Sequence, residues 1–414
     1  MSVLVVGYLV PEPSIEELCA TDRMPPMQTH RFMVGFVEAL DLGAANPVDL
    51  LSFLPTNDYP QGPRIWVPFR RWSARRKAVW WGAPFINVFP LKHLTRFSSA
   101  LALGLLWCFV RLAQRKTIVV VSAATPQLMA VWLVARLSRA KFVPCLMDPP
   151  SVELATDTGV KRLARRLDRR LAEALLAKGD AVIAVTRPLA GKFVPNRPAM
   201  LFEGTGPGLT DTKPADRHEP RFVCAYAGAL GDAYGLPLLL DAYRLLDPSR
   251  HALWIFGKGD GEEAVRAAAR ECEHIQFYGF LTAGLDERLR SADLLLMVRP
   301  SQGSDSEFVF PSKILYSMAL GVPTAVTRLK AIPEEYFEQL YTLDDADAAS
   351  LAASLEAIRT LPSEERQTRA DRMRAFVTER KSSSATGAAL WGFLEGLALG
   401  TPRSGSPSGT ATGR

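Results

Sequence analysis

The chain alternates short runs of β-branched and other apolar residues with longer segments in which apolar residues recur every three to four positions. The short runs predict strands and the longer segments predict helices, an alternation typical of βαβ units with parallel sheets. In the first half the predicted strands are 3–10, 48–53, 117–122, 141–147 and 181–186, and the predicted helices are 31–40, 98–114, 126–138 and 160–178. In the second half the predicted strands are 221–228, 252–257, 275–279, 292–298 and 323–327, and the predicted helices are 236–247, 261–272, 284–290 and 312–320.

Two such halves predict an α/β fold of two doubly wound, Rossmann-like domains facing a cleft. A length of 414 residues agrees with two domains, because one hydrophobic core rarely serves more than about 250–300 residues. Ligands of such folds bind outside the carboxyl ends of the strands. The predicted layout is a first domain over 1–205, a linker over 206–220, a second domain over 221–380, a C-terminal helix over 381–399 and a disordered tail over 400–414.

Charge separates the two halves. Residues 1–200 hold 26 Lys and Arg against 14 Asp and Glu, a net +12, whereas residues 201–414 hold 23 against 29, a net −6. A basic first half beside an acidic second half predicts that the first domain meets an anionic surface or substrate. The overall composition, 48% hydrophobic and 22% charged, is that of a globular protein.

Cysteine usage and the apolar runs predict a cytoplasmic protein. The five cysteines lie far apart with no C-x-x-C pair, which fits a reducing compartment and neither a disulfide framework nor a zinc site. The start, MSVLVVGYLV, has the pattern of a strand and lacks the basic region of a signal peptide. The longest apolar run, 100–110, has eleven residues, about half of what spans a bilayer, and it predicts a buried helix.

The segment EFVFPSKILYSMALGVPTAV (307–326) predicts an anion site. It follows a predicted strand and loop, and it predicts a helix from about 311 to 320. Pro311 is tolerated in a first helical turn, and Gly321 followed by Pro323 is typical of a helix end. The N–H groups of a helix start favour phosphate, and Lys313 adds a full positive charge there.

Several ordered motifs resemble the nucleotide-sugar half of GT-B glycosyltransferases, and in particular the retaining, family 4-like group that builds bacterial polysaccharides. The resemblance covers about residues 221–330, in the motifs YAGALGDAYGL (226–236), WIFGKGD (254–260), IQFYGFL (275–281), RPS (299–301) and FPSKILYSMALGVP (310–323). It implies transfer of a sugar from a nucleoside diphosphate sugar to a lipid-linked or saccharide acceptor held by the first domain. It implies no cofactor besides the donor substrate.

The resemblance also implies roles for individual residues. The glycines after the first strand of the second domain match the loop beneath the donor phosphates, and the segment 279–281 matches the one that receives the base. Glu307 and Lys313 match positions that hold the sugar and the diphosphate, where cations stabilise the charge that develops on the leaving group. The implied donor-binding residues are Gly228, Gly231, Gly279, Phe280, Leu281, Phe310, Pro311, Ser312, Lys313 and Tyr316.

The chain departs from the family pattern at the charged positions. The family's two glutamates fall on Phe308 and Tyr316, with Glu307 one residue before the first. The Arg and Lys of the phosphate loop fall on Ala229 and Tyr234. Tyr316 could bind the ribose or pack in the core. The departures leave a catalytically silent member of the fold as an alternative.

The first half resembles the family only in layout, as a strand, a Pro-containing loop (11–14) and a helix that starts at QTHRF (28–32). His30, at that helix start, is a candidate catalytic residue, with a structural role as the alternative. Asp148, at the end of a predicted strand, could contact the acceptor or cap the loop.

Two other motifs allow a functional and a structural interpretation. Asp345 and Asp347 resemble a metal-binding D-x-D, but they open a predicted helix (347–360), so capping is expected and no metal is predicted. The G-K-G at 257–259 fits either a ligand-facing loop or a turn.

Two basic stretches lie in the first half. FRRWSARRKAVWW (69–81) combines five cations with three tryptophans. In KRLARRLDRRLAEALL (161–176), leucines at every fourth position predict a packed stripe surrounded by cations. Cations and tryptophans favour anionic lipid headgroups, and no recognised nucleic-acid motif accompanies them. We therefore predict a cytoplasmic protein at the inner face of a membrane, with no nucleic-acid partner.

Overall fold

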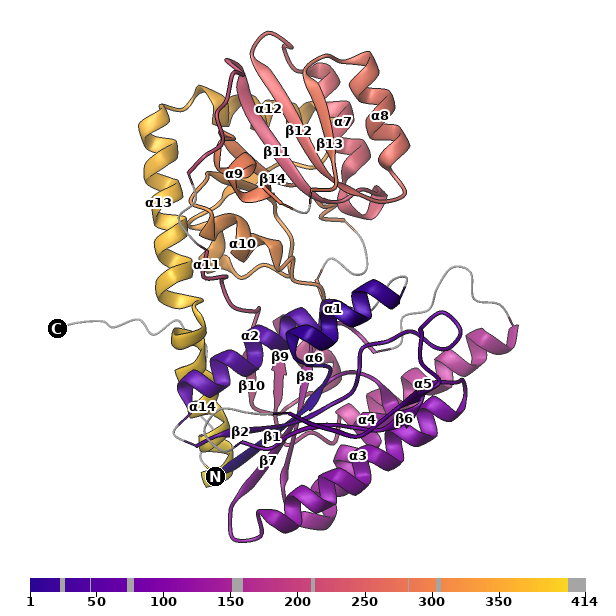
Figure 1. Ribbon diagram of the computed structural model, residues 1–414. Helices are drawn as coiled ribbons and strands as arrows, with labels where there is room; N and C mark the ends of the chain where they lie inside the picture. The colour runs from indigo at the N-terminus through magenta and orange to yellow at the C-terminus, as the bar shows by residue number, and fades with distance from the viewer. Residues whose placement is uncertain are drawn as a thin grey trace, which may run out of the picture. The chain divides into compact units, whose positions relative to one another are not determined.

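The computed structural model describes residues 1–22, 27–44, 46–72, 78–150, 159–209, 213–281, 283–302 and 307–400. The chain divides into two compact units (Figure 1), Met1–Thr205 together with the segment from Ser383 on, and Gly206–Ser382. The predicted disordered tail beyond residue 400 and positions 73–77 of the first basic stretch lie outside the described residues.

The first unit is built on a sheet whose strand order is β10-β9-β8-β7-β1-β2-β5-β4. All neighbours in it pair in parallel except β4 and β5. Its central strands are buried on both faces, which explains their nearly continuous apolar sequences. The strands are β1 (Ser2–Gly7), β2 (Val48–Ser52), β4 (Arg70–Trp72), β5 (Trp80–Gly82), β7 (Lys116–Val121), β8 (Lys141–Leu146), β9 (Val182–Ala184) and β10 (Ala199–Leu201), with a separate antiparallel pair of β3 (Trp66–Val67) and β6 (Phe85–Ile86).

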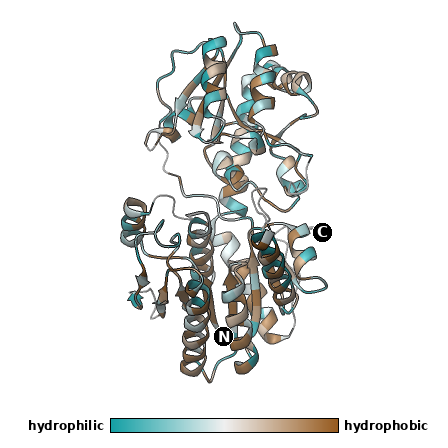
Figure 2. Cartoon of the chain, turned by 90° about the vertical axis from the view of Figure 1, so that its right-hand side faces the viewer, coloured by the Kyte–Doolittle hydropathy of each residue, from teal (hydrophilic) through white to brown (hydrophobic). Residues whose placement is uncertain are grey.

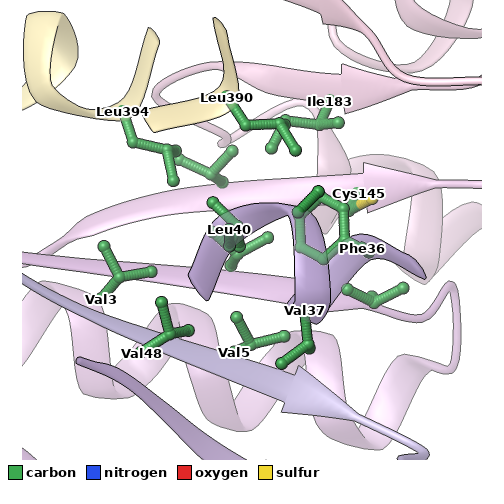
Figure 3. Packing of buried hydrophobic residues seen from close by; sticks show 14 of the residues in the cluster. Val3, Val5, Phe36, Val37, Leu40, Val48, Cys145, Ile183, Leu390 and Leu394 are labelled. Atoms are coloured by element: carbon green, nitrogen blue, oxygen red, sulfur yellow. The ribbon is translucent and has the colours of Figure 1, made fainter. Parts of the chain in front are cut away.

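The C-terminal helix belongs to the core of the first unit. Figure 3 shows Leu390 and Leu394 of α14 (Ser383–Leu399) packing with Phe36 of α2 (Met27–Gly43) over the sheet. The two helices approach so closely that a Cβ at Gly43 would lie 2.2 Å from the carbonyl oxygen of Gly387. The helix predicted over 381–399 is therefore no separate appendage. The other helices of the unit are α1 (Glu12–Thr21), α3 (Leu91–Val110), α4 (Thr125–Ser138), α5 (Gly159–Leu176) and α6 (Arg187–Phe193).

The interpretation of residues 11–14 as a loop was wrong. Pro11 is the N-cap of α1, and Pro13 lies in its first turn, where a missing backbone N–H loses no hydrogen bond. His30 therefore lies in the first turn of the second helix of the unit and not of the first.

The prediction that 100–110 is a buried helix was also wrong. Helix α3 packs on α4, and Trp107 on its inner face donates a hydrogen bond to Asp49 (2.7 Å). Its outer face is apolar and exposed, with Leu94 61% and Phe109 69% exposed. Figure 2 shows hydrophobic residues along the long helices of this unit. By length and composition alone α3 could cross a membrane, a test that core helices and signal sequences also pass.

The leucine stripe of α5 does not pack as predicted. Leu163, Leu167 and Leu171 are 59%, 55% and 46% exposed, and the buried residues lie in the last turns, at Ala172 and Leu175. The physical reason is length, because the 18 residues of α5 span about 27 Å and the 14 residues of α4, on which α5 packs, span about 21 Å. The first turns of α5 thus have no core to cover.

The second unit has a six-stranded sheet in the order β13-β12-β11-β14-β15-β16, with all neighbours parallel. This is the doubly wound order. Its strands are β11 (Phe222–Ala229), β12 (His251–Lys258), β13 (Ile275–Gly279), β14 (Leu294–Met297), β15 (Thr324–Thr327) and β16 (Tyr341–Leu343). Its helices are α7 (Leu236–Leu245), α8 (Glu262–Glu271), α9 (Leu285–Arg290), α10 (Lys313–Ala319), α11 (Glu334–Phe337), α12 (Ala348–Thr360) and α13 (Ser363–Arg380), with a short 3-10 helix at Asp232–Tyr234.

Candidate functional site

The carboxyl edge of the second sheet gathers most of the predicted donor-binding residues. Strands β11, β12 and β13 run in parallel and end at Ala229, Lys258 and Gly279, so their following loops lie along one edge. Gly228 and Gly231 lie at the end of β11, and Phe280 and Leu281 directly follow β13. The topology thus places these predicted segments where ligands of doubly wound sheets bind.

Gly228 and Lys313 come together at this edge. The Lys313 Nζ donates a hydrogen bond to the carbonyl oxygen of Ala227 (3.4 Å). A Cβ at Gly228 would lie 3.1 Å from that Nζ and 3.1 Å from the Tyr226 hydroxyl. The glycine therefore leaves the space that the ammonium group occupies. The pairing is non-local, because 85 residues separate the two positions in the sequence.

The close packing of β11 against β12 at their carboxyl ends requires the two glycines of the G-K-G loop (257–259). Gly257 has φ 148°, and a Cβ there would lie 1.8 Å from the carbonyl oxygen of Gly228. Gly259 has φ 158°, and a Cβ there would lie 2.2 Å from the carbonyl oxygen of Leu230. Both glycines allow the ends of β11 and β12 to touch. Lys258, between the two glycines, is exposed. The segment is therefore both a turn and a loop at the carboxyl edge, so the two interpretations of the sequence do not exclude each other.

Two further cations stand at this edge that the sequence analysis did not select. The Lys258 Nζ lies 4.9 Å from the ring centre of Phe280, and the Arg299 guanidinium lies 5.6 Å from that of Tyr234. Thr327 fixes the backbone of Arg299 by accepting from its N–H (3.1 Å) and donating to its carbonyl oxygen (2.5 Å). Arg299 thus faces the loop where the family's basic residues are missing. The available signal was a cation directly after a buried strand, in DLLLMVRP.

Phe280 has the exposure expected of a base-contacting residue. It is 60% exposed, and it follows Gly279, whose φ of 69° turns the chain at the end of β13. Leu281 instead is half-buried and packs on the hydrophobic core of the unit. Of the three predicted residues, Gly279 therefore makes the turn, Phe280 exposes an aromatic ring, and Leu281 packs on the core.

Tyr316 already has a partner. Its hydroxyl donates a hydrogen bond to the carboxylate of Asp286, on α9. Burial, followed by this hydrogen bond, raises the pKa of Tyr316 well above its usual value. The sequence analysis missed Asp286, for which no local signal existed. The pair brings a carboxylate to the helix position where the family carries a glutamate.

The remaining predicted residues of the segment 307–313 differ in how far their side chains are buried. The Phe310 side chain is a core residue, 7% exposed with its ring centre 5.5 Å from that of Tyr336, and its assignment to donor binding stays a prediction. Pro311 and Glu307 are half-buried, and Ser312 is exposed as the N-cap residue. Helix α10 begins at Lys313, later than predicted, because Ile314 N–H donates to the carbonyl oxygen of Pro311 in a tighter first turn (2.9 Å).

The D-A-D motif has structural roles. Asp347 caps α12 by accepting a hydrogen bond from Ser350 N–H (2.8 Å), as predicted. Asp345 accepts from Ser301 N–H (2.6 Å) and so holds the loop after β14. Among the described residues no group of three or more His, Cys, Asp and Glu could hold a metal ion, and the absence of a metal stays a prediction.

In the first unit, His30 and Asp148 both lie at the carboxyl edge of the sheet. His30 is 7% exposed, and its Nδ1 is 3.3 Å from the carbonyl oxygen of Tyr8, which directly follows β1. Burial lowers the pKa of His30, which favours a neutral imidazole near pH 7. Asp148 is half-buried just after β8. Their catalytic and acceptor roles stay predictions.

Comparison with known proteins agrees with this geometry. Residues 221–360 match the family model described as Glycosyl transferases group 1. No curated protein matches the chain by sequence. The structure resembles that of OtsA (TM-score 0.63, 11% identity, 95% of this chain and 99% of that one). It also resembles that of Anabaena HepE in complex with UDP, with a TM-score of 0.58 and 13% identity over 95% of this chain and 100% of that one. A third similar structure is that of the lipopolysaccharide outer core galactosyltransferase WaaB, with a TM-score of 0.57 and 13% identity over 95% of this chain and 99% of that one.

These likenesses define the class. The chain has the fold of GT-B glycosyltransferases, and its residues 221–360 match the family model of the group 1 glycosyltransferases. The predicted class and fold are therefore confirmed. At 11–13% identity the structural likeness concerns the fold, so the donor, the acceptor and the stereochemistry are matters of proposal.

Proposed function

We propose that this protein transfers a sugar from a nucleoside diphosphate sugar to a lipid-linked or polysaccharide acceptor, with retention at the anomeric carbon. The observation that carries the proposal is the placement of the Lys313 ammonium group against Gly228, at the carboxyl edge of the sheet in the group 1 domain. The cations Lys258 and Arg299 at the same edge support it. Structures with this fold that hold UDP or UDP-glucose make UDP-sugars the first donors to test.

The proposed chemistry places the cations where charge develops. The bond between the anomeric carbon and the donor diphosphate breaks, the acceptor hydroxyl oxygen bonds to that carbon, and its proton is released. The nucleoside diphosphate leaves as an anion, so stabilising its charge lowers the barrier without a proton donor. We assign this stabilisation to Lys313 and Arg299, and contact with the donor sugar to Glu307.

The alternative is a catalytically silent protein that binds a nucleotide sugar or partners an active glycosyltransferase. Tyr316 favours it, because its hydroxyl is already engaged by Asp286 and the family's glutamate is absent at its position. Both proposals expect donor binding, and they differ in turnover.

A thermal-shift screen of the full chain against UDP-, GDP- and ADP-sugars tests the shared expectation. A ligand present at a hundred times its Kd stabilises the folded state by about 2.7 kcal/mol, because it binds only that state. We expect one nucleotide class to raise the unfolding temperature while the free sugars do not. The donor found in this way is then incubated with saccharide acceptors, and release of the nucleoside diphosphate distinguishes the enzyme from the silent protein. A flat response to every sugar nucleotide would contradict both.

We further propose that the first unit binds an anionic membrane from the cytoplasmic side. Helix α5 supports this, because its exposed leucines share the helix with six basic residues, Lys161, Arg162, Arg165, Arg166, Arg169 and Arg170. Helix α3, which shares the neighbour α4 with α5, adds an exposed apolar face. Its inner face is packed and bonded to Asp49, so α3 would lie on the bilayer and not across it.

The expected result is sedimentation with anionic vesicles at low salt and release as salt shortens the Debye length. Each basic residue near the surface contributes about 1 kcal/mol. Replacing Leu163 and Leu167 together by Asn should weaken vesicle binding about tenfold or more, because each buried leucine contributes about 1.5–3 kcal/mol. The control is Leu245→Asn, at a 61% exposed position of the second unit, and it should bind as the unaltered chain does. Equal binding to neutral and anionic vesicles would overturn the proposal.

A further inference from the structure

The first unit contains a polar cavity of about 460 Å³ that none of the predicted site residues lines. Its walls come from Tyr8 after β1, from the loop after β2 that carries Asp58 and Gln61, and from Lys92 and Arg96 in the first turns of α3. It therefore lies at the carboxyl edge of the parallel strands, where doubly wound folds bind ligands. Its volume is that of a small-molecule site.

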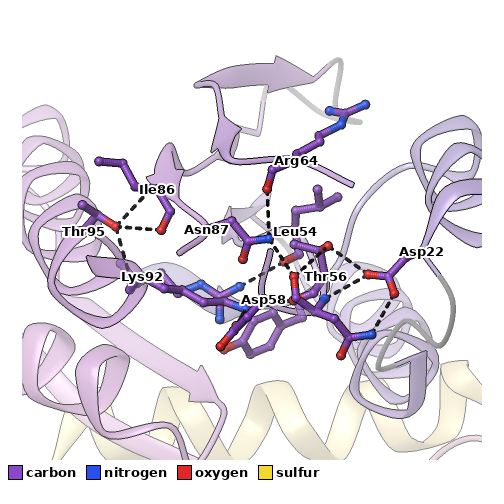
Figure 4. Close-up of polar contacts among 12 residues, drawn as sticks. Asp22, Leu54, Thr56, Asp58, Arg64, Ile86, Asn87, Lys92 and Thr95 are labelled. Carbon is purple, nitrogen blue, oxygen red and sulfur yellow. Dashed lines mark hydrogen bonds and ion pairs between the residues drawn. The ribbon is translucent and has the colours of Figure 1, made fainter. Parts of the chain in front are cut away.

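Two cations face this cavity, the buried Lys92 and the half-buried Arg96. Lys92 is 7% exposed, and its Nζ donates to the carbonyl oxygen of Thr56 (2.9 Å) and to Asp58, as Figure 4 shows. The guanidinium of Arg96 lies 4.3 Å from the ring centre of Phe85, and it donates to the carbonyl oxygen of Leu54 (3.3 Å). Spaced four residues apart, both cations lie on one side of the helix.

Two carboxylates lie close to the two cations within the described residues. Asp58 is the carboxylate that lines the cavity with them. Asp22 is close but holds the loop itself, by accepting from the Thr56 hydroxyl (3.0 Å) and from Asn57 N–H (2.9 Å). The buried Nε of Arg96 has no hydrogen-bond partner among the described residues. Lys92 and Arg96 both line the cavity, and an anionic ligand there would accept charge-assisted hydrogen bonds from their ammonium and guanidinium groups.

We propose that this cavity binds a phosphoryl group of the acceptor substrate, as a phosphate or diphosphate ester, through Arg96 and Lys92. The inference rests on the proposed function only in naming the ligand as the acceptor. A phosphoryl group fits because a guanidinium and an ammonium group together offer the charge-assisted hydrogen bonds that its oxygens accept. Tyr8 and Thr29, which also line the cavity, offer hydroxyl groups for the rest of the ligand.

The test is calorimetric titration of the full chain, presaturated with UDP so that the donor site is occupied. Three probes are titrated, namely glucose 6-phosphate, geranyl diphosphate and uncharged glucose. We expect a phosphorylated probe to bind and glucose not to bind. Arg96→Met should weaken that binding about tenfold or more, while UDP affinity, measured separately, stays unchanged.

A second variant keeps the proposal testable if Arg96→Met does not fold. Gln61 is exposed at the cavity wall, so Gln61→Glu adds a negative charge without removing a packed group. It should weaken binding of the phosphorylated probe several-fold, by repulsion. The matched control is Gln114→Glu, which adds the same charge beyond the other end of α3 and should leave binding unchanged.

The outcomes separate the possible sources of the phosphoryl group. Stronger binding of geranyl diphosphate supports a lipid-linked acceptor, and stronger binding of glucose 6-phosphate supports a soluble sugar phosphate. Equal binding of glucose, or phosphate binding that neither variant changes, overturns the proposal and leaves Lys92 and Arg96 as anchors of the loop. Failure of UDP to bind counts against the proposed donor site alone, since the probes can be titrated without it.

Discussion

Replacing Lys313 by Ala should weaken UDP binding ten- to a hundredfold. A charge-assisted hydrogen bond contributes about 1.5–3 kcal/mol, which corresponds to that range of affinity. The effect should lie at the upper end, because the family's Arg and Lys of the phosphate loop are Ala229 and Tyr234 here, so that Lys313 carries more of the neutralisation. Its Nζ already stands within hydrogen-bonding distance of the end of β11, the strand that leads into the loop expected beneath the donor phosphates.

Calorimetric titration with UDP and with uridine provides the measurement. Uridine lacks phosphates, so its affinity should hardly change in Lys313→Ala. Lys313→Arg keeps the charge and should lose less affinity for UDP than Lys313→Ala does. The matched control is Lys213→Ala, which removes an exposed lysine from the linker segment of the same unit. Unaltered affinity for UDP in Lys313→Ala would disprove the assignment of Lys313 to the diphosphate.

Replacing Gly257 by Ala should destabilise the second unit by about 3 kcal/mol or more. Two effects add, since φ of 148° is strained for a residue with a side chain and the new Cβ would lie 1.8 Å from the carbonyl oxygen of Gly228. The contacted oxygen belongs to the backbone, which cannot move out of the way as the end of a flexible side chain can. Relief of the clash would separate the ends of β11 and β12 and displace the end of β11, to which Lys313 is hydrogen-bonded, so UDP affinity should fall as well.

Scanning calorimetry of the full chain measures this change in the transition that UDP shifts. For a unit of this size we expect the unfolding temperature to fall by about 6–12 °C. Gly279→Ala is the matched control, because its φ of 69° carries strain but a Cβ there meets no atom within 4 Å. It should cost only about 1–2 kcal/mol. If Gly257→Ala proves no more harmful than Gly279→Ala, close contact of the strand ends is not what requires this glycine.

The sequence by itself determined the class of fold and the sheet edge at which the donor is proposed to bind. Each of the ten strands predicted from apolar runs is present, with ends shifted by a few residues, because burial on both faces of a parallel sheet imposes a local pattern. The stop at Gly321 and the capping by Asp347 were equally local, since a turn or a cap depends on neighbouring residues. Lys313 was found from the predicted helix start, whereas Gly228 was found through the family resemblance.

Only the tertiary structure decided which side chains meet at the candidate sites. Asp286 reaches Tyr316 from another helix, and Arg96 and Lys92 face a loop more than thirty residues earlier in the chain. It also decided the exposed faces of α3 and α5, whose patterns alone predicted burial. A repeat of leucines shows that a helix has an apolar face. Whether that face is covered depends on the lengths and positions of its neighbours, which no local pattern contains.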